Sequence, residues 1–103
     1  MLYSKPCEYA IRSLAFLASS RRTAGAEKIA LAENIPVPVL SKILQELARK
    51  GLLESKRGPG GGFHLARRSD LITLRDVVAA IDGLDHLRAW IRITLRQLVR
   101  KEW

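Results

Sequence analysis

Four glycines and one proline fall within the six residues 57–62, and this segment limits the possible folds more than any other. It reads Arg-Gly-Pro-Gly-Gly-Gly, a composition that predicts a turn. Two short apolar runs with alternating character flank it, at 52–56 and 62–66. We therefore predict two strands joined by a glycine-rich tip at 57–61, directly after a helix that ends at Gly51.

Two helices are predicted at the start of the chain. The first covers 4–19, with Ser4 as its N-cap and Pro6 in its first turn, where a missing N–H does no harm. The second covers 26–33. It stops at the segment 34–36, Asn-Ile-Pro, because the residue before a proline avoids helical angles.

A third helix is predicted from about Pro38 to Gly51. Its apolar residues recur at i, i+3, i+4 and i+7, the spacing of a core-facing stripe, and are Leu40, Ile43, Leu44 and Leu47. Its other face is exposed near the N-terminus and comprises Pro38, Ser41, Lys42 and Gln45. Two helices joined by a short turn, the second with a polar N-terminal face, are typical of a helix-turn-helix. With the hairpin that follows, the pattern predicts a mainly α, winged helix-turn-helix fold with a two-stranded β wing.

Two further helices are predicted after the hairpin. Thr73 and Asp76 form a capping-box pattern that starts a fourth helix, which ends at Gly83. The stretch from about 85 to 102 reads as a fifth helix with a wide apolar stripe. Because the other helices suffice for a core, we expect a second copy of the chain to cover this stripe, which comprises Leu87, Trp90, Ile91, Thr94, Leu95 and Leu98. The predicted organisation is a DNA-binding domain at 1–83 and a dimerisation helix at 84–103.

The last helix also carries a basic stripe, formed by Arg88, Arg92, Arg96 and Arg100. Neighbouring arginines at this spacing repel each other by a few tenths of a kcal/mol. A solvated helix face is the plain interpretation. Pairing with acidic residues of a partner copy, such as Asp82 or Asp85, explains the stripe better.

The charge balance points to an anionic partner. Eighteen basic residues oppose ten acidic ones, which gives a net charge of +8. Such a domain usually meets a polyanion. No apolar run approaches the ~18 residues of a membrane span, and the N-terminus lacks the layout of a signal peptide. With a single cysteine, Cys7, a disulfide framework is excluded, and the cytoplasm is the expected location. Two histidines and no acid–base constellation argue against an enzyme.

Several stretches together resemble the Rrf2 family of bacterial winged-helix transcriptional regulators. They read Ile35-Pro-Val-Pro-Val-Leu-Ser-Lys-Ile-Leu-Gln-Glu-Leu, Lys50-Gly-Leu-Leu, Arg57-Gly-Pro-Gly-Gly-Gly-Phe and Ile72-Thr-Leu-Arg-Asp-Val-Val-Ala-Ala-Ile-Asp-Gly. The opening Tyr3-Ser-Lys-Pro-Cys-Glu-Tyr-Ala-Ile-Arg is similar to the first helix of the family. The resemblance covers most of residues 3–83.

The resemblance implies a homodimeric repressor that binds a palindromic operator in double-stranded DNA. The third helix would enter the major groove, and Arg57 the minor groove, where the glycines of the tip allow a close approach. Carried over by position, the DNA-binding residues would be Lys5, Pro38, Ser41, Lys42, Gln45, Lys56, Arg57, Gly58, Gly60 and Arg67. An ordinary hairpin and a solvated helix face are the plain alternatives. A phosphate-binding P-loop is excluded by its missing lysine and hydroxyl residue.

The chain departs from the family where many members carry three cysteines and an iron–sulfur cluster. Here the segment 82–85, Asp-Gly-Leu-Asp, runs directly into the last predicted helix without a cysteine. A cluster is expected only if a cysteine-bearing loop between Asp85 and His86 is missing from the sequence, having been edited out or left out as disordered; otherwise the loop is lost.

Three residues are candidates for a sensor, each with a plainer interpretation. Cys7 lies in the first turn of a helix, where the dipole can lower a thiol pKa, although a half-buried structural thiol is the favoured alternative. Glu8 can serve the helix dipole or, as in some relatives, ligate a cluster. His86 is a surface histidine or a ligand. The rival function from another class is a protein–protein adaptor that docks a partner without recognising DNA.

Overall fold

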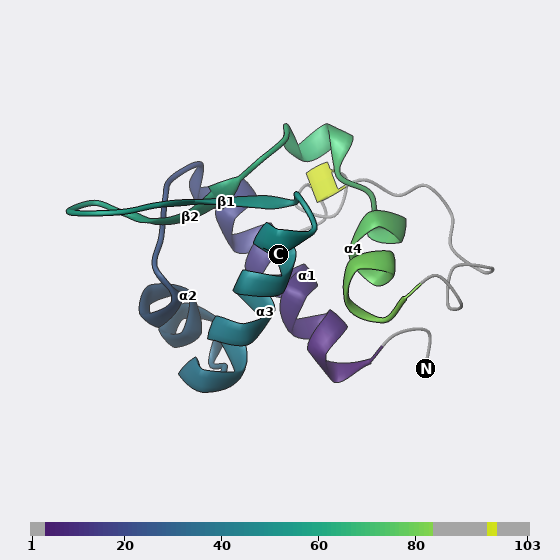
Figure 1. Cartoon of the computed structure of the whole chain (residues 1–103), viewed down its shortest axis with the longest axis horizontal. Coiled ribbons are helices and arrows are strands. Elements are labelled where there is room, and N and C mark those ends of the chain that lie inside the picture. Colours follow the sequence, from purple (N-terminus) through teal and green to yellow (C-terminus); the bar gives the residue numbers. More distant parts are fainter. Residues whose placement is uncertain (1–3, 84–94, 97–103) are drawn as a thin grey trace.

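The computed structural model spans residues 1–103, and its described part comprises residues 4–83 and 95–96. Helix α1 lies at the centre, α4 packs on one side of it, α3 crosses in front, and the hairpin projects away from the helices past α2 (Figure 1). The elements in chain order are α1 (Lys5–Ser20), α2 (Ala26–Glu33), α3 (Val37–Arg49), β1 (Leu53–Lys56), β2 (Gly62–Leu65), the 3₁₀ turn η1 (Ser69–Leu71) and α4 (Leu74–Ile81).

Short polar residues set the helix ends, as predicted. The Ser4 hydroxyl accepts from the backbone N–H of Cys7 at 3.2 Å and so caps α1. Asn34 ends α2 in the left-handed conformation, at φ 56°. The capping box of α4 is complete: Asp76 N–H donates to the Thr73 hydroxyl at 3.0 Å, and Thr73 N–H donates to the Asp76 carboxylate at 2.9 Å. The predicted bounds of α2 and the two strands agree to within one residue.

The two strands form an antiparallel sheet whose register pairs Leu53 with Leu65 and Lys56 with Gly62. The outer edge of β2 is bonded to the segment between α1 and α2. There Ala24 N–H donates to the Phe63 carbonyl at 3.0 Å, and Phe63 N–H donates to the Ala24 carbonyl at 2.8 Å. The wing is therefore fastened to the helical body close to the point where its tip begins, since Phe63 pairs with Ser55, next to the last pair of the ladder.

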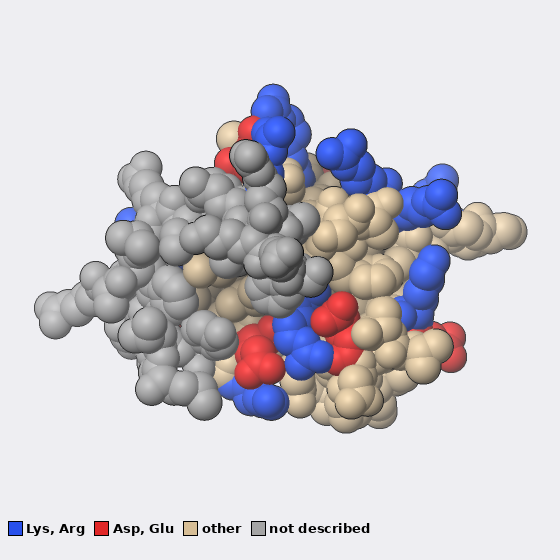
Figure 2. All heavy atoms as spheres, turned by 180° about the vertical axis from the view of Figure 1, so that it is seen from behind, with Lys and Arg blue, Asp and Glu red and all other residues tan. Residues whose placement is uncertain are grey.

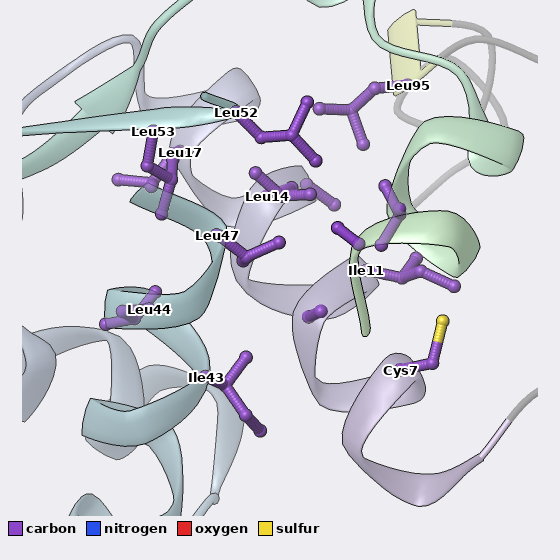
Figure 3. Close-up of a cluster of buried hydrophobic side chains, with 14 of the residues drawn as sticks. Cys7, Ile11, Leu14, Leu17, Ile43, Leu44, Leu47, Leu52, Leu53 and Leu95 are labelled. Carbon is purple, nitrogen blue, oxygen red and sulfur yellow. The ribbon is translucent and has the colours of Figure 1, made fainter. Parts of the chain in front are cut away.

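The hydrophobic core lies between α1, α3 and α4, with β1 closing one end (Figure 3). The predicted α3 stripe is buried, and Leu44 and Leu47 are fully inaccessible. Leu14 of α1 and Leu52 face them, each burial contributing about 1.5–3 kcal/mol. Leu95 packs on the same core beside Leu52. This arrangement holds α3 with its other face turned outward.

Within the described residues, no helix has the length and apolar character needed to cross a bilayer. The fifth helix predicted over 85–102 falls almost wholly outside the described residues. Of it the structure describes only Leu95 and Arg96.

Candidate nucleic-acid interface

Besides the shared core, Arg12 links the helix-turn-helix to α1. Arg12 extends from α1 to the end of α2, where its guanidinium donates to the Glu33 carboxylate at 3.3 Å and to the Glu33 backbone carbonyl. The same side chain lies 3.3 Å from the Glu8 carboxylate and 5.8 Å from the centre of the Tyr9 ring. These partly buried, charge-assisted contacts fix the end of α2, and with it the turn that aims α3.

The first two turns of α3 present a face of mixed polarity. Pro38, Lys42 and Gln45 are exposed, and Ser41 is half-buried. All four residues predicted for the recognition face therefore lie on one outward side of the helix, opposite its buried stripe. Hydroxyl, amide and ammonium groups can read base edges in a major groove.

Two exposed valines join this face, and the sequence prediction missed them. Val37 and Val39 are 39% and 40% exposed in the first turn of α3. Helical spacing does not single them out, because Val37 lies three residues before Leu40 and Val39 lies four before Ile43. Apolar side chains on such a face can contact the methyl group of thymine.

The tip of the wing is exposed from Lys56 to Gly60, so both predicted cations at its base, Lys56 and Arg57, are accessible. Gly58 and Gly60 have positive φ angles of 87° and 74°, with open space where a Cβ would stand. They give the turn its shape and leave its outer surface free, as an approach to a backbone requires.

The other two glycines of the tip serve the hairpin itself. A Cβ on Gly61 would lie 2.2 Å from the Lys56 carbonyl oxygen, and one on Gly62 would lie 2.4 Å from the backbone of Ala24. These two positions therefore require glycine because of packing within the protein. The sequence analysis had explained the tip glycines by a close approach to phosphates.

The remaining predicted backbone contacts lie in two different places. Lys5 is exposed at the start of α1, next to Pro6, which lines a groove of about 400 Å³ together with Pro38 and Lys42 of α3. Lys5 therefore lies near the α3 face. Arg67 follows β2 and sits 3.7 Å from the Asp76 carboxylate, on a separate hollow behind the wing. The structure does not bring it together with the α3 face.

Comparison with known proteins identifies the family. The family model of Rrf2, described as an iron-dependent transcriptional regulator, matches residues 3–100. A putative HTH-type transcriptional regulator of Aquifex aeolicus is 42% identical over 79 residues, which are 76% of this chain and 55% of the relative. The regulator IscR of Cereibacter sphaeroides is 36% identical over 87 residues, 80% of this chain and 56% of the relative. The chain belongs to the Rrf2 family.

Solved structures show the same fold. CymR, the global cysteine regulator of B. subtilis, superposes with a TM-score of 0.83 at 20% identity, covering 95% of both chains. IscR of T. potens superposes with a TM-score of 0.81 at 22% identity, covering 95% of this chain and 85% of that one. The winged-helix prediction is confirmed, and Rrf2 proteins are transcriptional regulators rather than enzymes. The chain spans about half the length of the curated relatives it matches.

The described residues of this chain do not fit the iron chemistry named for the Rrf2 family. Its single cysteine, Cys7, is fully buried, and burial together with the nearby Asp82 carboxylate raises its pKa to about 12. Burial therefore opposes the lowering of the thiol pKa that a sensor would need, and it favours the structural alternative. Across residues 4–83 and 95–96, no three ligating side chains are grouped as a metal ion requires.

Of the other two candidate sensor residues, Glu8 is among the described residues and His86 is not. Glu8 forms ion pairs with Arg12 and, at 3.5 Å, with Lys5, so its carboxylate is engaged by two basic residues of its own helix. His86 lies outside the described residues. Asp85 and His86 are adjacent in the sequence, and no cysteine lies near them.

Most of the residues predicted to pair two Rrf2 protomers lie outside the described residues. These are Leu87, Trp90, Ile91, Thr94 and Leu98. Leu95 is described, and it is only 1% exposed against the core of its own chain. Its N–H donates to the Ile72 carbonyl at 2.7 Å. Next to it, Arg96 of the basic stripe lies 3.4 Å from Asp70 of the same chain.

Proposed function

We propose that this Rrf2 protein is a sequence-specific regulator of transcription that binds double-stranded DNA as a homodimeric repressor in the cytoplasm. The observation that carries the proposal is the outward face of α3, where Pro38, Ser41, Lys42 and Gln45 stand together on a chain with net charge +8. The exposed Arg57 at the base of the wing's tip supplies a second contact point.

In this proposal the α3 face reads base edges in the major groove of a palindromic site, and Arg57 enters the adjacent minor groove. Its guanidinium would favour narrow, A·T-rich segments, where the negative potential is enhanced. Lys5 and Lys56 would bind the phosphate backbone, with Gly58 and Gly60 letting the tip approach. Phosphate contacts would supply most of the affinity and make it salt-dependent.

Selection of binding sites from random duplexes, followed by anisotropy titration, tests the proposal. We expect a two-fold symmetric site and weaker binding by Arg57→Ala, with the loss concentrated at A·T-rich positions. The control is Arg75→Ala, which removes the same charge from α4, on the side of the molecule away from the wing (Figure 1). Equal binding by Arg57→Ala and the parent would refute the role of Arg57. No enriched site at all would favour the adaptor function.

The dimer is tested separately, by sedimentation of the full chain with and without the selected duplex. We expect a mass of two chains on one palindromic site. A single chain bound per duplex would contradict the homodimer while leaving the DNA-binding face intact. An assay of iron and labile sulfide in anaerobically purified protein tests the proposed lack of a cluster.

A further inference from the structure

A basic hollow of about 570 Å³ lies behind the wing, between the end of α1, the segment 21–23, the end of β2 and the segment 67–70. Arg96 completes its wall. None of the residues proposed for base recognition lines it. The hollow is a second feature, apart from the α3 face, and its volume falls in the range of small-molecule sites. Its lining residues with charge are Arg21, Arg22, Arg67, Arg68, Arg96 and Asp70.

The charges of the hollow do not balance. Its single carboxylate, Asp70, lies 2.6 Å from Arg68 and 3.4 Å from Arg96, and the hydrogen bond from Arg68 lowers its pKa. Arg67 has Asp76 at 3.7 Å. Among the described residues, no carboxylate lies within ion-pair distance of Arg21 or Arg22. Seen from behind, basic side chains follow the upper edge of the molecule towards the wing, with acidic atoms beside them at one end, and other acidic side chains lie lower down next to basic ones (Figure 2).

The dipole of helix α1 offsets only part of the positive charge of these arginines. Its C-terminus carries a partial negative charge of about one half and attracts cations within the last turn. Two full charges follow it directly, and three more arginines come from other segments. The half charge therefore leaves the hollow strongly positive.

Arg21 occupies a backbone position that a glycine would fill with less strain. It ends α1 in the left-handed conformation, at φ 54°, where a side chain costs energy. The chain thus keeps a guanidinium on the wall of the hollow despite the strain. The imidazole of His64 also lines the hollow, and its Nδ1 is buried without a hydrogen-bond partner in the described part of the chain.

We propose that this hollow binds a small oxyanion with two or more negative charges, of the phosphate or polycarboxylate class, separately from DNA. Guanidinium forks bind such oxyanions through paired hydrogen bonds. A concave site surrounded by several arginines suits a compact ion better than one side of a duplex. Because Arg96 belongs to the segment beyond α4, the bound ion would join that segment to the winged domain.

Inorganic pyrophosphate is the probe, added to the full chain in the absence of DNA with ionic strength held constant by chloride. We expect it to raise the melting temperature, as any ligand of the native state does. Binding by calorimetry should be about tenfold weaker in Arg21→Gly and in Arg22→Gln, because each loses charge-assisted hydrogen bonds. Arg21→Gly should itself be no less stable than the parent, since glycine relieves the strained φ, so its loss of binding would not reflect misfolding.

The matched control is Arg49→Gln, which removes an exposed arginine of α3 that pairs with Glu46 at 2.7 Å outside the hollow. It should bind pyrophosphate like the parent. A melting temperature that responds equally to pyrophosphate and chloride would overturn the proposal. The proposal would also fail if Arg21→Gly and Arg22→Gln each lowered the slope of log K against log salt for DNA binding by about 1. Such a change would mean that these arginines contact the DNA backbone. Since the binding assay contains no DNA, its result is independent of operator recognition.

Discussion

The backbone N–H of Ser4 donates to the Asp82 carboxylate at 2.8 Å, and the Ser4 hydroxyl donates to its second oxygen. The N-cap of the first helix is thereby joined to the residue that ends the fourth, 78 positions later. The same hydroxyl accepts from Cys7 N–H, so one serine connects both ends of the winged domain.

Removal of the Asp82 carboxylate should therefore destabilise the fold. In Asp82→Ala two partly buried donors of Ser4 lose their acceptor, which costs about 1–3 kcal/mol in the free energy of unfolding. Urea denaturation measures this value. Glu27→Ala, at an exposed carboxylate of α2, is the control and should change stability by less. Similar losses in the two variants would show that the Ser4 contact contributes little.

The stability of the protein should fall between about pH 9 and pH 12 because of Cys7. Its pKa is about 12 in the folded chain against an ordinary value of 9.0, so the unfolded chain releases this proton first as the pH rises. Stability from the protonated thiol is complete below pH 9 and is lost as the pH rises towards 12. The contribution to the slope approaches ~1.4 kcal/mol per pH unit.

Comparison with Cys7→Ala isolates this effect from other alkaline titrations. The difference in unfolding free energy between parent and variant should shrink as the pH rises through this window. A difference that stays constant with pH would contradict the raised thiol pKa. Alkylation of native Cys7 by iodoacetamide at pH 8 should likewise be slow and become fast in urea.

Gly62→Ala should disrupt the contact between β2 and the segment that precedes α2. The residue has φ 136°, and an added Cβ would lie 2.4–2.6 Å from backbone atoms of Ala24 and Gly25, which cannot swing away as a side chain could. We expect a loss of at least about 2 kcal/mol. Gly25→Ala is the matched control, because Gly25 has φ −78° and open space at the Cβ position. As an N-cap change it should cost less than about 1 kcal/mol. Comparable losses would refute the steric argument.

Lys42→Ala should reduce the salt dependence of DNA binding if Lys42 contacts a phosphate, and sequence preference if it contacts a base. The first case lowers the slope of log K against log salt by about 1 for each lost contact. Titrations at several salt concentrations with cognate and scrambled duplexes distinguish the two. An unchanged slope and an unchanged preference would remove Lys42 from the interface.

The sequence predicted most of this fold because the decisive signals are local. The stripe of α3, the stop at Asn34 and the capping box at Thr73 each depend on residues within about two turns of one another. The sequence favoured a half-buried Cys7, but its full burial could not be predicted this way, since it depends on α4 packing against α1. The same holds for the contact between Ser4 and Asp82.

The two candidate sites also differ in whether they depend on local spacing or on contacts between distant segments. The α3 face could be predicted from helical spacing alone. The basic hollow could not, because Arg21 and Arg68 meet only after the hairpin folds back beside the end of α1. The different roles of the tip glycines could not be predicted either, because Gly62 is crowded by the backbone of Ala24 and Gly61 by the backbone of the turn itself.

The pairing of Ala24 with Phe63 has one more consequence. A strand with an open side can recruit a strand from another molecule, and this is a common route to aggregation. Here β2 meets β1 on one side and Ala24 on the other, so the backbone of Phe63 has no free edge to offer. This stretch of the exposed wing therefore cannot recruit a strand from another molecule.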